Sequence, residues 1–463
     1  MYLALLALVS ASVLQSADAW NNGLQKTPAM GFNTWNRFQC NINEDLIRQT
    51  AVQMKDLGFL DAGYTFINID DCWLLKNRDA NGNLVTDSQK FPSGLKNLTD
   101  FLHSLGFKAG IYEDLGLTTC AGFAGSLNHE LTDARLFVDL GFDYAKIDNC
   151  DSGSFPGTNP ERFKRWTDAT TQVQQETGKM LFYSFVEWQS FDAWTWGPPI
   201  ANSWRMYDDI QPNWGRITAI LNNASFIGDF SNFWGHNDLD MLENGNGALT
   251  LAEQRSHFTA WALAKSPLLI GTDISSLSQD SIDILLNPEI IAINQDTQIG
   301  EPLKPFFWGK NPDGTWDPTF PAQYWSGYFQ DEKHTAIMYI NFNERTVDLN
   351  FTFSHSPHLK ADKKYAVRDL WKHEDKGVVS NFFFDGSIAS HDPQSYSYNR
   401  LLTPVEVATV MKSNPRSDSL DRPLTRTKEL FPAAYADRYD LAILFLPSTA
   451  CPEVLPQGTL FGN

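Results

Sequence analysis

Short apolar runs alternate with helix-like stretches between residues 27 and 296. Each run has an apolar interior and ends in polar or aromatic residues, a pattern typical of parallel strands that are buried on both faces. Between the runs lie stretches such as 44–57, whose apolar residues recur at helical spacing. Eight runs are predicted to be strands: 31–35, 66–71, 109–114, 144–148, 181–188, 204–209, 237–241 and 268–272.

Alternating strands and helices favour a parallel α/β architecture. A doubly wound sheet would also fit the alternation, but it would not require eight units. Eight units within residues 27–296 match the usual size of a (β/α)8 TIM barrel, and the fold is therefore predicted to be this barrel. We place the catalytic barrel at residues 20–298.

The pattern changes after the barrel. Short alternating runs separated by turn residues, such as 335–341 and 347–351, predict a C-terminal antiparallel β-sandwich at residues 299–412. The stretch at 413–463 has no clear pattern, and we assign it neither a fold nor a function.

The N-terminus has the features of a secretory signal peptide. An apolar run at 3–14 is followed by a small-x-small sequence that ends at Ala19, although no Lys or Arg lies near Met1. The run is too short to remain as a membrane anchor. We therefore expect residues 1–19 to be a signal peptide and the protein to be secreted. Three sequons fit glycosylation on that route: Asn97, Asn223 and Asn350.

The charge balance narrows the range of partners. The 463 residues include 36 Lys and Arg and 55 Asp and Glu, which gives a net charge of −19. Such a chain repels nucleic acid and anionic membranes, so neither is an expected partner. The 42% hydrophobic content allows a large core, and 15 Trp residues include rings that could stack on sugars, although most Trp residues pack in cores.

Carboxylates gather where the predicted strands end. The active site of a (β/α)8 barrel lies at the C-terminal ends of its strands. Buried charges are costly, so their accumulation at these ends indicates a function. The residues at the ends are Trp35, Asp70, Asp71, Tyr112, Glu113, Asp114, Lys146, Asp148, Glu187, Trp188, Arg205, Asp208, Asp209, Asp238 and Asp240.

Two kinds of site could use these carboxylates. A divalent metal could bind Asp70, Asp71 and Asp148, but Lys146 and Arg205 would repel it. Histidine, the usual ligand of catalytic transition metals, is almost absent from the strand ends. Recognition of sugar hydroxyls fits better, because carboxylates accept hydrogen bonds from neighbouring hydroxyls while Lys and Arg donate them. Two further carboxylates could then cleave a glycosidic bond. We expect no metal and no cofactor.

Eight short motifs make the sequence recognisable: Pro-Ala-Met-Gly-Phe-Asn-Thr-Trp at 28–35, Asn-Ile-Asp-Asp-Cys-Trp at 68–73, Gly-Ile-Tyr at 110–112, Cys-Ala-Gly-Phe at 120–123, Lys-Ile-Asp at 146–148, Trp-Arg at 204–205, Asn-Asp-Leu-Asp-Met at 237–241 and Ala-Ile-Asn-Gln-Asp at 292–296. Each alone is weak, but the set is highly specific. With these motifs the chain resembles family 27 of the glycoside hydrolases, the melibiase-type α-galactosidases and α-N-acetylgalactosaminidases.

The resemblance implies a retaining mechanism with a covalent glycosyl-enzyme. Its nucleophile would be Asp148, in the Lys-x-Asp motif, and its acid/base would be Asp209, four residues after Arg205. Asp208 is the rival for the second role, but neighbouring strand residues point to opposite faces, and the spacing selects Asp209. Lys146 would help to keep Asp148 ionised. Burial and nearby carboxylates should raise the pKa of Asp209.

The resemblance also implies the sugar contacts. Asp70 and Asp71 would bind the 4- and 6-hydroxyls and so select galactose. Glu187 would bind the 2-hydroxyl and fill the space of an N-acetyl group. The remaining contacts would be Trp35 stacked on the ring, Tyr112 and Lys146 lining the pocket, and Arg205 and Asp240 at the 2- and 3-hydroxyls.

The resemblance accommodates four of the five cysteines. It implies the disulfides Cys40–Cys72 and Cys120–Cys150, and it leaves Cys451 without a partner.

We therefore expect a retaining exo-α-galactosidase that acts on α-galactoside oligosaccharides or polysaccharides. An α-N-acetylgalactosaminidase, a β-L-arabinopyranosidase and a non-catalytic sugar-binding protein remain the alternatives.

Overall fold

The computed structural model describes residues 19–151, 156–188, 191–311, 314–384 and 386–401. The expected signal peptide, apart from its last residue, and the stretch at 413–463 with Cys451 lie outside these residues. Within the described residues, no helix is long and apolar enough to cross a membrane.

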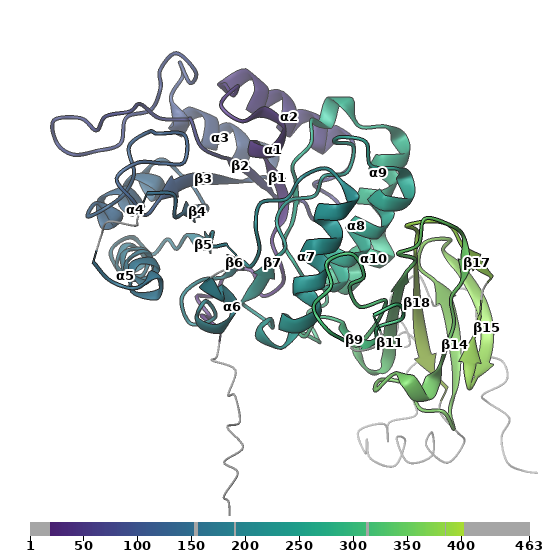
Figure 1. The fold of residues 1–463 in the computed structure, drawn as a ribbon. Coiled ribbons are helices and arrows are strands. Elements are labelled where there is room, and N and C mark those ends of the chain that lie inside the picture. Colours follow the sequence, from purple (N-terminus) through teal and green to yellow (C-terminus); the bar gives the residue numbers. More distant parts are fainter. Residues whose placement is uncertain (1–18, 152–155, 189–190, 312–313, 385, 402–463) are drawn as a thin grey trace, which may run out of the picture. The chain divides into compact units, whose positions relative to one another are not determined.

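Eight parallel strands form the first sheet, in the order β7-β6-β5-β4-β3-β2-β1-β8. Just beyond β7, Leu242 forms a parallel bridge with Ile270 of β8, which joins the two ends of the sheet. The predicted (β/α)8 barrel is therefore confirmed (Figure 1). Its strands are β1 (Met30–Asn33), β2 (Phe66–Ile69), β3 (Lys108–Asp114), β4 (Tyr144–Asp148), β5 (Phe182–Phe185), β6 (Ser203–Arg205), β7 (His236–Asp238) and β8 (Leu268–Ile270).

Apolar strands and amphipathic helices produce this layering. All four residues of β2 are buried, as expected of a strand with the sheet on both sides and helices outside it. Where β1 lies against β2, a Cβ on Gly31 would come within 2.2 Å of the Phe66 carbonyl oxygen, so only glycine fits there.

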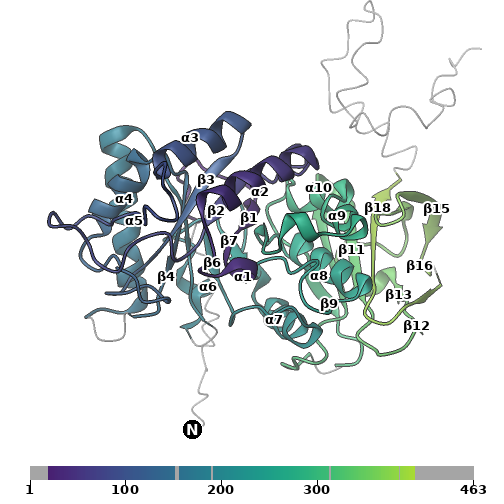
Figure 2. The same ribbon diagram turned by 90° about the horizontal axis from the view of Figure 1, so that it is seen from above.

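The helices lie around the barrel strands, as two perpendicular views show (Figures 1 and 2). The helix predicted at 44–57 is α2, which begins after Asn43, whose side chain accepts a hydrogen bond from the Leu46 amide as an N-cap. The helices are α1 (Trp35–Phe38), α2 (Glu44–Asp56), α3 (Leu95–Leu105), α4 (Glu130–Asp139), α5 (Asn159–Thr177), α6 (Ala193–Trp196), α7 (Trp214–Ile227), α8 (Leu251–Leu263), α9 (Gln279–Leu285) and α10 (Pro288–Asn294).

Several strands end earlier than the sequence pattern predicts. β5 and β6 end at Phe185 and Arg205, so Glu187 and Asp209 lie in the loops that follow. Trp35 is the first residue of α1 rather than the end of β1. Beyond Arg205, a side chain holds the backbone at Ile210, whose amide donates a hydrogen bond to an oxygen of Asp240 at 2.9 Å.

A second, antiparallel sheet follows the barrel, as predicted. It has six strands in the order β15-β14-β18-β11-β10-β9, and two short pairs, β12 with β17 and β13 with β16, accompany it. Phe351, Phe353, Tyr396 and Tyr398 belong to its aromatic core. The strands are β9 (Lys304–Phe307), β10 (Tyr324–Phe329), β11 (Asp331–Ile340), β12 (Val347–Asp348), β13 (Phe351–Thr352), β14 (Lys364–Asp369), β15 (Glu374–Ser380), β16 (Phe382–Phe383), β17 (Ser387–Ile388) and β18 (Pro393–Arg400).

One sequon is incompatible with this fold. Asn223 lies inside α7, where its side chain is buried and its Nδ2 donates to the Met206 carbonyl at 3.0 Å. A glycan needs that nitrogen at the surface, so the prediction of glycosylation at Asn223 is wrong. Asn97 and Asn350 are exposed, and glycosylation at these two residues stays a prediction.

Candidate active site

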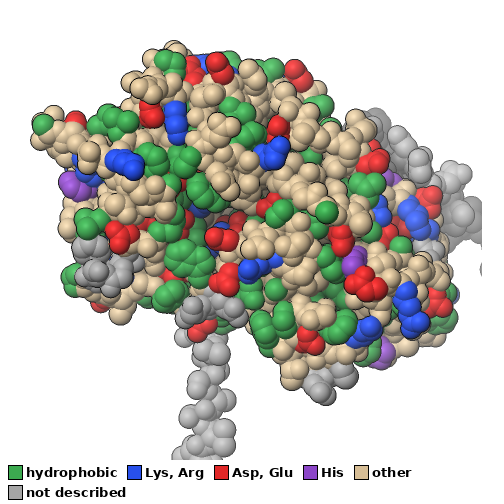
Figure 3. Space-filling model, turned by 45° about the horizontal axis from the view of Figure 1, so that its top comes forward, with side chains coloured by type: hydrophobic (Ala, Val, Ile, Leu, Met, Phe, Trp, Pro, Cys, Tyr) green, Lys and Arg blue, Asp and Glu red, His purple; other side chains and the backbone are tan. Residues whose placement is uncertain are grey.

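A cavity of about 450 Å³ opens where the barrel strands end. Acidic and hydrophobic side chains surround a hollow on the face shown in Figure 3. Nine of the ten predicted site residues line the cavity. The described residues of its wall are Trp35, Asn36, Arg37, Gln39, Asp70, Asp71, Tyr112, Cys120, Lys146, Asp148, Cys150, Trp188, Arg205, Asp209, Ile210, Gln211, Pro212, Asp240, Met241, Glu243, Asn246 and Gly247.

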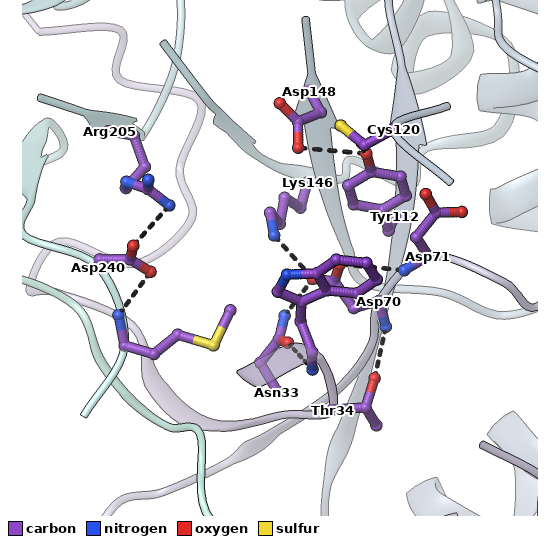
Figure 4. A network of polar contacts seen from close by, with 12 residues as sticks. Asn33, Thr34, Asp70, Asp71, Tyr112, Cys120, Lys146, Asp148, Arg205 and Asp240 are labelled. Carbon is purple, nitrogen blue, oxygen red and sulfur yellow. Dashed lines mark hydrogen bonds and ion pairs between the residues drawn. The ribbon is translucent and has the colours of Figure 1, made fainter. Parts of the chain in front are cut away.

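Asp70 is fixed from three sides just beyond β2 (Figure 4). Its Oδ2 accepts a hydrogen bond from Asn33 Nδ2 at 2.7 Å and lies 2.8 Å from the ammonium group of Lys146. Its amide donates to the Thr34 hydroxyl at 3.0 Å. The side-chain oxygen of Asn33 also accepts from the Trp35 amide, so this one residue helps to position both a carboxylate and an aromatic ring. Asn33 is not among the site residues predicted from the sequence.

Asp71 holds the loop after β3. Its Oδ2 accepts from the Ala121 amide at 2.9 Å, and its Oδ1 accepts from the Thr119 hydroxyl at 3.0 Å and from the amide of Cys72. Burial raises the pKa of Asp71, although these donors work to lower it. A carboxylate offers about four lone-pair positions, so Asp71 can still accept from a hydroxyl in the cavity.

Asp148 ends β4, and both of its oxygens have donors. Oδ2 accepts from the Tyr112 hydroxyl at 3.1 Å (Figure 4). Oδ1 accepts from the Asn149 amide at 2.9 Å. Burial raises the pKa of Asp148 to about 6, even though Lys146 and Arg205 work to lower it. Lys146 thus acts in the expected direction, but burial outweighs it.

Arg205, at the end of β6, forms ion pairs with two carboxylates of the cavity wall, Asp209 and Asp240. Its guanidinium is buried, and it lies 2.9 Å from an oxygen of Asp240 and 2.5 Å from an oxygen of Asp209. The Asp209 side chain is 72% exposed. Desolvation works to raise the pKa of Asp209, but the charge and hydrogen bond of Arg205 outweigh it and lower that pKa below its ordinary value. The prediction of a raised pKa for Asp209 is therefore wrong, because the cation that marks this residue in the sequence also stabilises its ionised form.

Asp208 and Asp209 separate as expected, but for another reason. Asp209 lines the cavity, whereas Asp208 does not and lies 3.8 Å from Arg216. Strand alternation cannot explain this, because β6 ends at Arg205. The irregular segment that follows the strand places the two carboxyls.

Glu187 occupies a different place from the one predicted. Its side chain is fully buried and is absent from the described wall of the cavity, whereas the next residue, Trp188, lines it. An oxygen of Glu187 accepts a hydrogen bond from Asn149 Nδ2, and burial raises the pKa of Glu187 to about 8. The predicted contact between Glu187 and a sugar 2-hydroxyl is corrected accordingly, because the carboxyl faces the residue beside Asp148.

Glu243 is an acidic residue of the cavity wall that was not predicted from the sequence. Glu243 is buried, and its two oxygens accept hydrogen bonds from the side-chain amides of Asn36 and Asn246. Burial raises the pKa of Glu243 to about 7. Its position two residues beyond the 237–241 motif was the available signal.

The cysteines form the pairs that the resemblance implied. Cys40 joins Cys72, and Cys120 joins Cys150. Cys120 and Cys150 also lie close to the carboxylates of Asp114 and Asp148 in a group that could suggest a metal site. Sulfurs that share a disulfide are not thiolates, however, so this group does not have the donors of a metal site.

Comparisons with known proteins agree with this architecture. The family described as Alpha galactosidase A matches residues 27–296, and the Alpha galactosidase C-terminal beta sandwich domain matches residues 319–397. The chain is 39% identical over 423 residues to probable alpha-galactosidase B of Penicillium simplicissimum, which covers 84% of this chain and 97% of that one.

Solved structures give the same picture. Alpha-galactosidase I from Mortierella vinacea superposes with a TM-score of 0.75 at 32% identity and covers 82% of this chain and 98% of its own. The Saccharomyces cerevisiae enzyme, solved with raffinose, has a TM-score of 0.73 at 29% identity and covers 83% of this chain and 100% of its own.

Proposed function

The chain belongs to glycoside hydrolase family 27, the family of Alpha galactosidase A, and from this membership and the pocket geometry we infer how it works as an exo-α-galactosidase. It hydrolyses terminal non-reducing α-D-galactose residues. The observation that supports the assignment of roles is that Asp148, at the end of β4, and Asp209, in the loop after β6, line the same cavity.

Asp148 is the nucleophile of the proposed mechanism. One of its oxygens forms a bond to C1 of galactose while the bond from C1 to the glycosidic oxygen breaks. Asp209 gives its proton to that oxygen as the leaving group departs. A water molecule then attacks C1, Asp209 takes a proton from it, and the bond to Asp148 breaks. Two inversions leave galactose with its original α-configuration.

The protonation states of Asp148 and Asp209 follow from their different surroundings on the β4 side and the β6 side of the cavity, which we call its two walls. The pKa of Asp148 is about 6 and that of Asp209 is lowered. At pH values between these two pKa values the pair therefore holds one proton, mostly on Asp148. Catalysis needs the proton on Asp209. When substrate is bound, a protonated Asp209 can donate a hydrogen bond to the glycosidic oxygen. Arg205, which then loses its ion pair with Asp209, still has its ion pair with Asp240. The reactive arrangement is thus a minor form of the singly protonated pair.

Galactose selection rests on the β2 side. Asp70 is held by Asn33 and Lys146 with its carboxylate in the cavity wall, where it accepts from the 4- or 6-hydroxyl together with Asp71. Trp35 and Tyr112 line the same cavity and provide apolar surface for the sugar ring. Terminal α-galactosides of oligosaccharides are the proposed substrates.

A substrate panel tests this function. Aryl α-galactoside should be hydrolysed with a higher kcat/KM than aryl α-N-acetylgalactosaminide or aryl β-L-arabinopyranoside. Preference for either of the other two would overturn the substrate, and binding of galactose without turnover of any of the three would overturn the enzymatic role.

We also propose that the protein is secreted. The signal-like sequence up to Ala19 and the two disulfides support this location. Expression of residues 1–463 in a secreting host should release a chain that begins at Trp20 into the medium. Retention of the whole chain, with Met1, inside the cells would contradict it.

A further inference from the structure

Three consecutive residues at and after the end of β4 are each held by a different neighbour. Asp148 accepts from the Tyr112 hydroxyl at 3.1 Å. Asn149 donates through its side-chain amide to Glu187, in the loop after β5. The amide of Cys150 donates to Asp114 Oδ2 at 2.8 Å. The segment that carries Asp148 is therefore tied to β3 and to the loop after β5.

The bond from Asn149 to Glu187 acts on Asp148 through the backbone. The amide of Asn149 donates to Asp148 Oδ1 at 2.9 Å. The direction of this amide depends on the backbone angles of Asn149, and a buried side-chain bond on the same residue restricts those angles. Asn149 thus donates from its side-chain amide to Glu187 and from its backbone amide to the carboxylate of Asp148.

Glu187 has no direct access to a substrate in this arrangement. Its side chain is fully buried and lies outside the described wall of the cavity. A carboxyl placed there needs a partner, because burial of a polar group without one is costly. Asn149 supplies a donor for one oxygen of Glu187 and so links this carboxyl to the segment of Asp148, whereas the other oxygen, Oε2, is buried without a hydrogen-bond partner among the described residues.

We propose that Glu187 is a positioning residue for Asp148, acting through the Asn149 amide. The proposal rests on the nucleophilic role proposed for Asp148. The link keeps Asp148 Oδ1 bound to its donor and turned toward C1. Loss of the link lets the segment at 148–150 shift, and displacements near 1 Å at a reacting group cost about 10²-fold in rate.

Two substitutions at Glu187 separate positioning from general stability. Glu187→Ala should lower kcat and kcat/KM on an aryl α-galactoside by about 10- to 100-fold while KM stays nearly unchanged, because the loss falls on the transition state. Glu187→Gln should restore most of the rate, since its amide oxygen can accept from Asn149. Unchanged kcat in Glu187→Ala would overturn the proposal.

A 2-deoxy substrate tests the competing role. If Glu187 only positions Asp148, Glu187→Ala should lose the same factor on an aryl 2-deoxy-α-galactoside as on the aryl α-galactoside. If Glu187 binds the 2-hydroxyl, the loss should nearly vanish on the 2-deoxy substrate, and this result would overturn the proposal.

Asn149→Ala removes the same link from its other end and keeps the backbone amide. It should resemble Glu187→Ala, and the double variant should lose little more than either one, because both remove a single interaction. It also keeps the test valid if Glu187→Ala does not fold. Additive losses would show that the two residues act separately and would contradict the proposal.

Glu253→Ala is the control for lost buried carboxyls. Glu253 is buried on α8, accepts from the Thr250 amide at 2.8 Å and lies outside the described wall of the cavity. This variant should lower the Tm and leave kcat unchanged. The wild-type enzyme is assayed in the same series: no turnover of the α-galactoside by the wild type would refute the proposed function itself, whereas wild-type turnover with an unaffected Glu187→Ala refutes only the positioning role.

Discussion

The two walls of the pocket hold their carboxylates in opposite ways. On the β4 side, Asp148 is buried among neutral donors, and burial raises its pKa to about 6. On the β6 side, Asp209 is 72% exposed, and Arg205 lowers its pKa. The nucleophile therefore sits in the environment that favours a proton, and the acid in the one that opposes it. The reaction needs Asp148 ionised and Asp209 protonated, whereas the two environments favour the opposite protonation states.

This contrast gives the catalytic pair a narrow working range. The pair carries its single proton only between the lowered pKa of Asp209 and the pKa of about 6 at Asp148. The walls also differ in their support, since a disulfide and three hydrogen-bonded residues hold the β4 side, whereas ion pairs of Arg205 hold the β6 side. Four experiments probe this difference.

Removal of the nucleophile should have the largest effect. Asp148→Asn keeps the size of the side chain and its hydrogen bond to the Asn149 amide but cannot form the glycosyl ester, so kcat should fall by about 10⁴-fold or more. Steady-state assays on an aryl α-galactoside measure the loss, and unfolding curves check that the variant folds. Substantial residual turnover would remove Asp148 from the nucleophilic role.

Removal of the acid should have a smaller effect that depends on the leaving group. Asp209→Asn should lower kcat/KM by about 10²- to 10⁴-fold on a disaccharide, whose leaving oxygen needs a proton. The loss should be much smaller on a dinitrophenyl galactoside, which leaves without one. Equal losses on both substrates would contradict the acid role, and Asp208→Asn, which changes a carboxyl outside the cavity wall, is the matched control.

The pH profile tests the proton shared between the walls. Above pH 6 the pair loses its remaining proton, so kcat/KM should fall by about tenfold for each further pH unit. At low pH both carboxyls are protonated and no nucleophile remains, so the optimum should be acidic. Rate measurements with a substrate whose leaving group can be detected at every pH give the profile. An optimum above pH 7 would contradict the assigned environments.

Loss of the Cys120–Cys150 disulfide should have the smallest effect on rate. Opening this link in Cys120→Ala/Cys150→Ala frees the segment beside Asp148, and we expect kcat to fall by about three- to tenfold, with a stability loss of about 2–5 kcal/mol. The Cys40–Cys72 disulfide has a similar sequence separation, 32 against 30 residues, and neither of its cysteines is part of the described cavity wall, so Cys40→Ala/Cys72→Ala is the comparison variant. It should cost similar stability with less change in kcat. Equal kcat losses would mean that the disulfide does not specifically support the β4 wall.

The barrel and the site positions were predictable because they follow from local pattern. Eight apolar runs with polar ends specify eight parallel strands, and the site of such a barrel lies at their C-terminal ends. The motifs around Asp70 and Asp148 then gave residues that the structure places in the cavity wall. Both signals depend only on residues that are close in the sequence.

The details that were missed depend on residues from other parts of the chain. The direction of the Glu187 side chain depends on Asn149, after a different strand, and the pKa of Asp209 depends on how closely Arg205 approaches it. The burial of Asn223 results from packing of α7, which a three-residue sequon cannot report. In each case the decisive partner or packing surface comes from the tertiary structure.

Trapping of the glycosyl-enzyme shows which carboxylate forms the covalent bond to galactose. A fluorinated galactosyl substrate with a good leaving group slows the second step more than the first, so the covalent intermediate accumulates. Proteolysis and peptide mass spectrometry should then locate one galactosyl group on Asp148. A label on Asp209 or on another residue, or stoichiometric release of the leaving group with no labelled peptide, would contradict the account of the two walls.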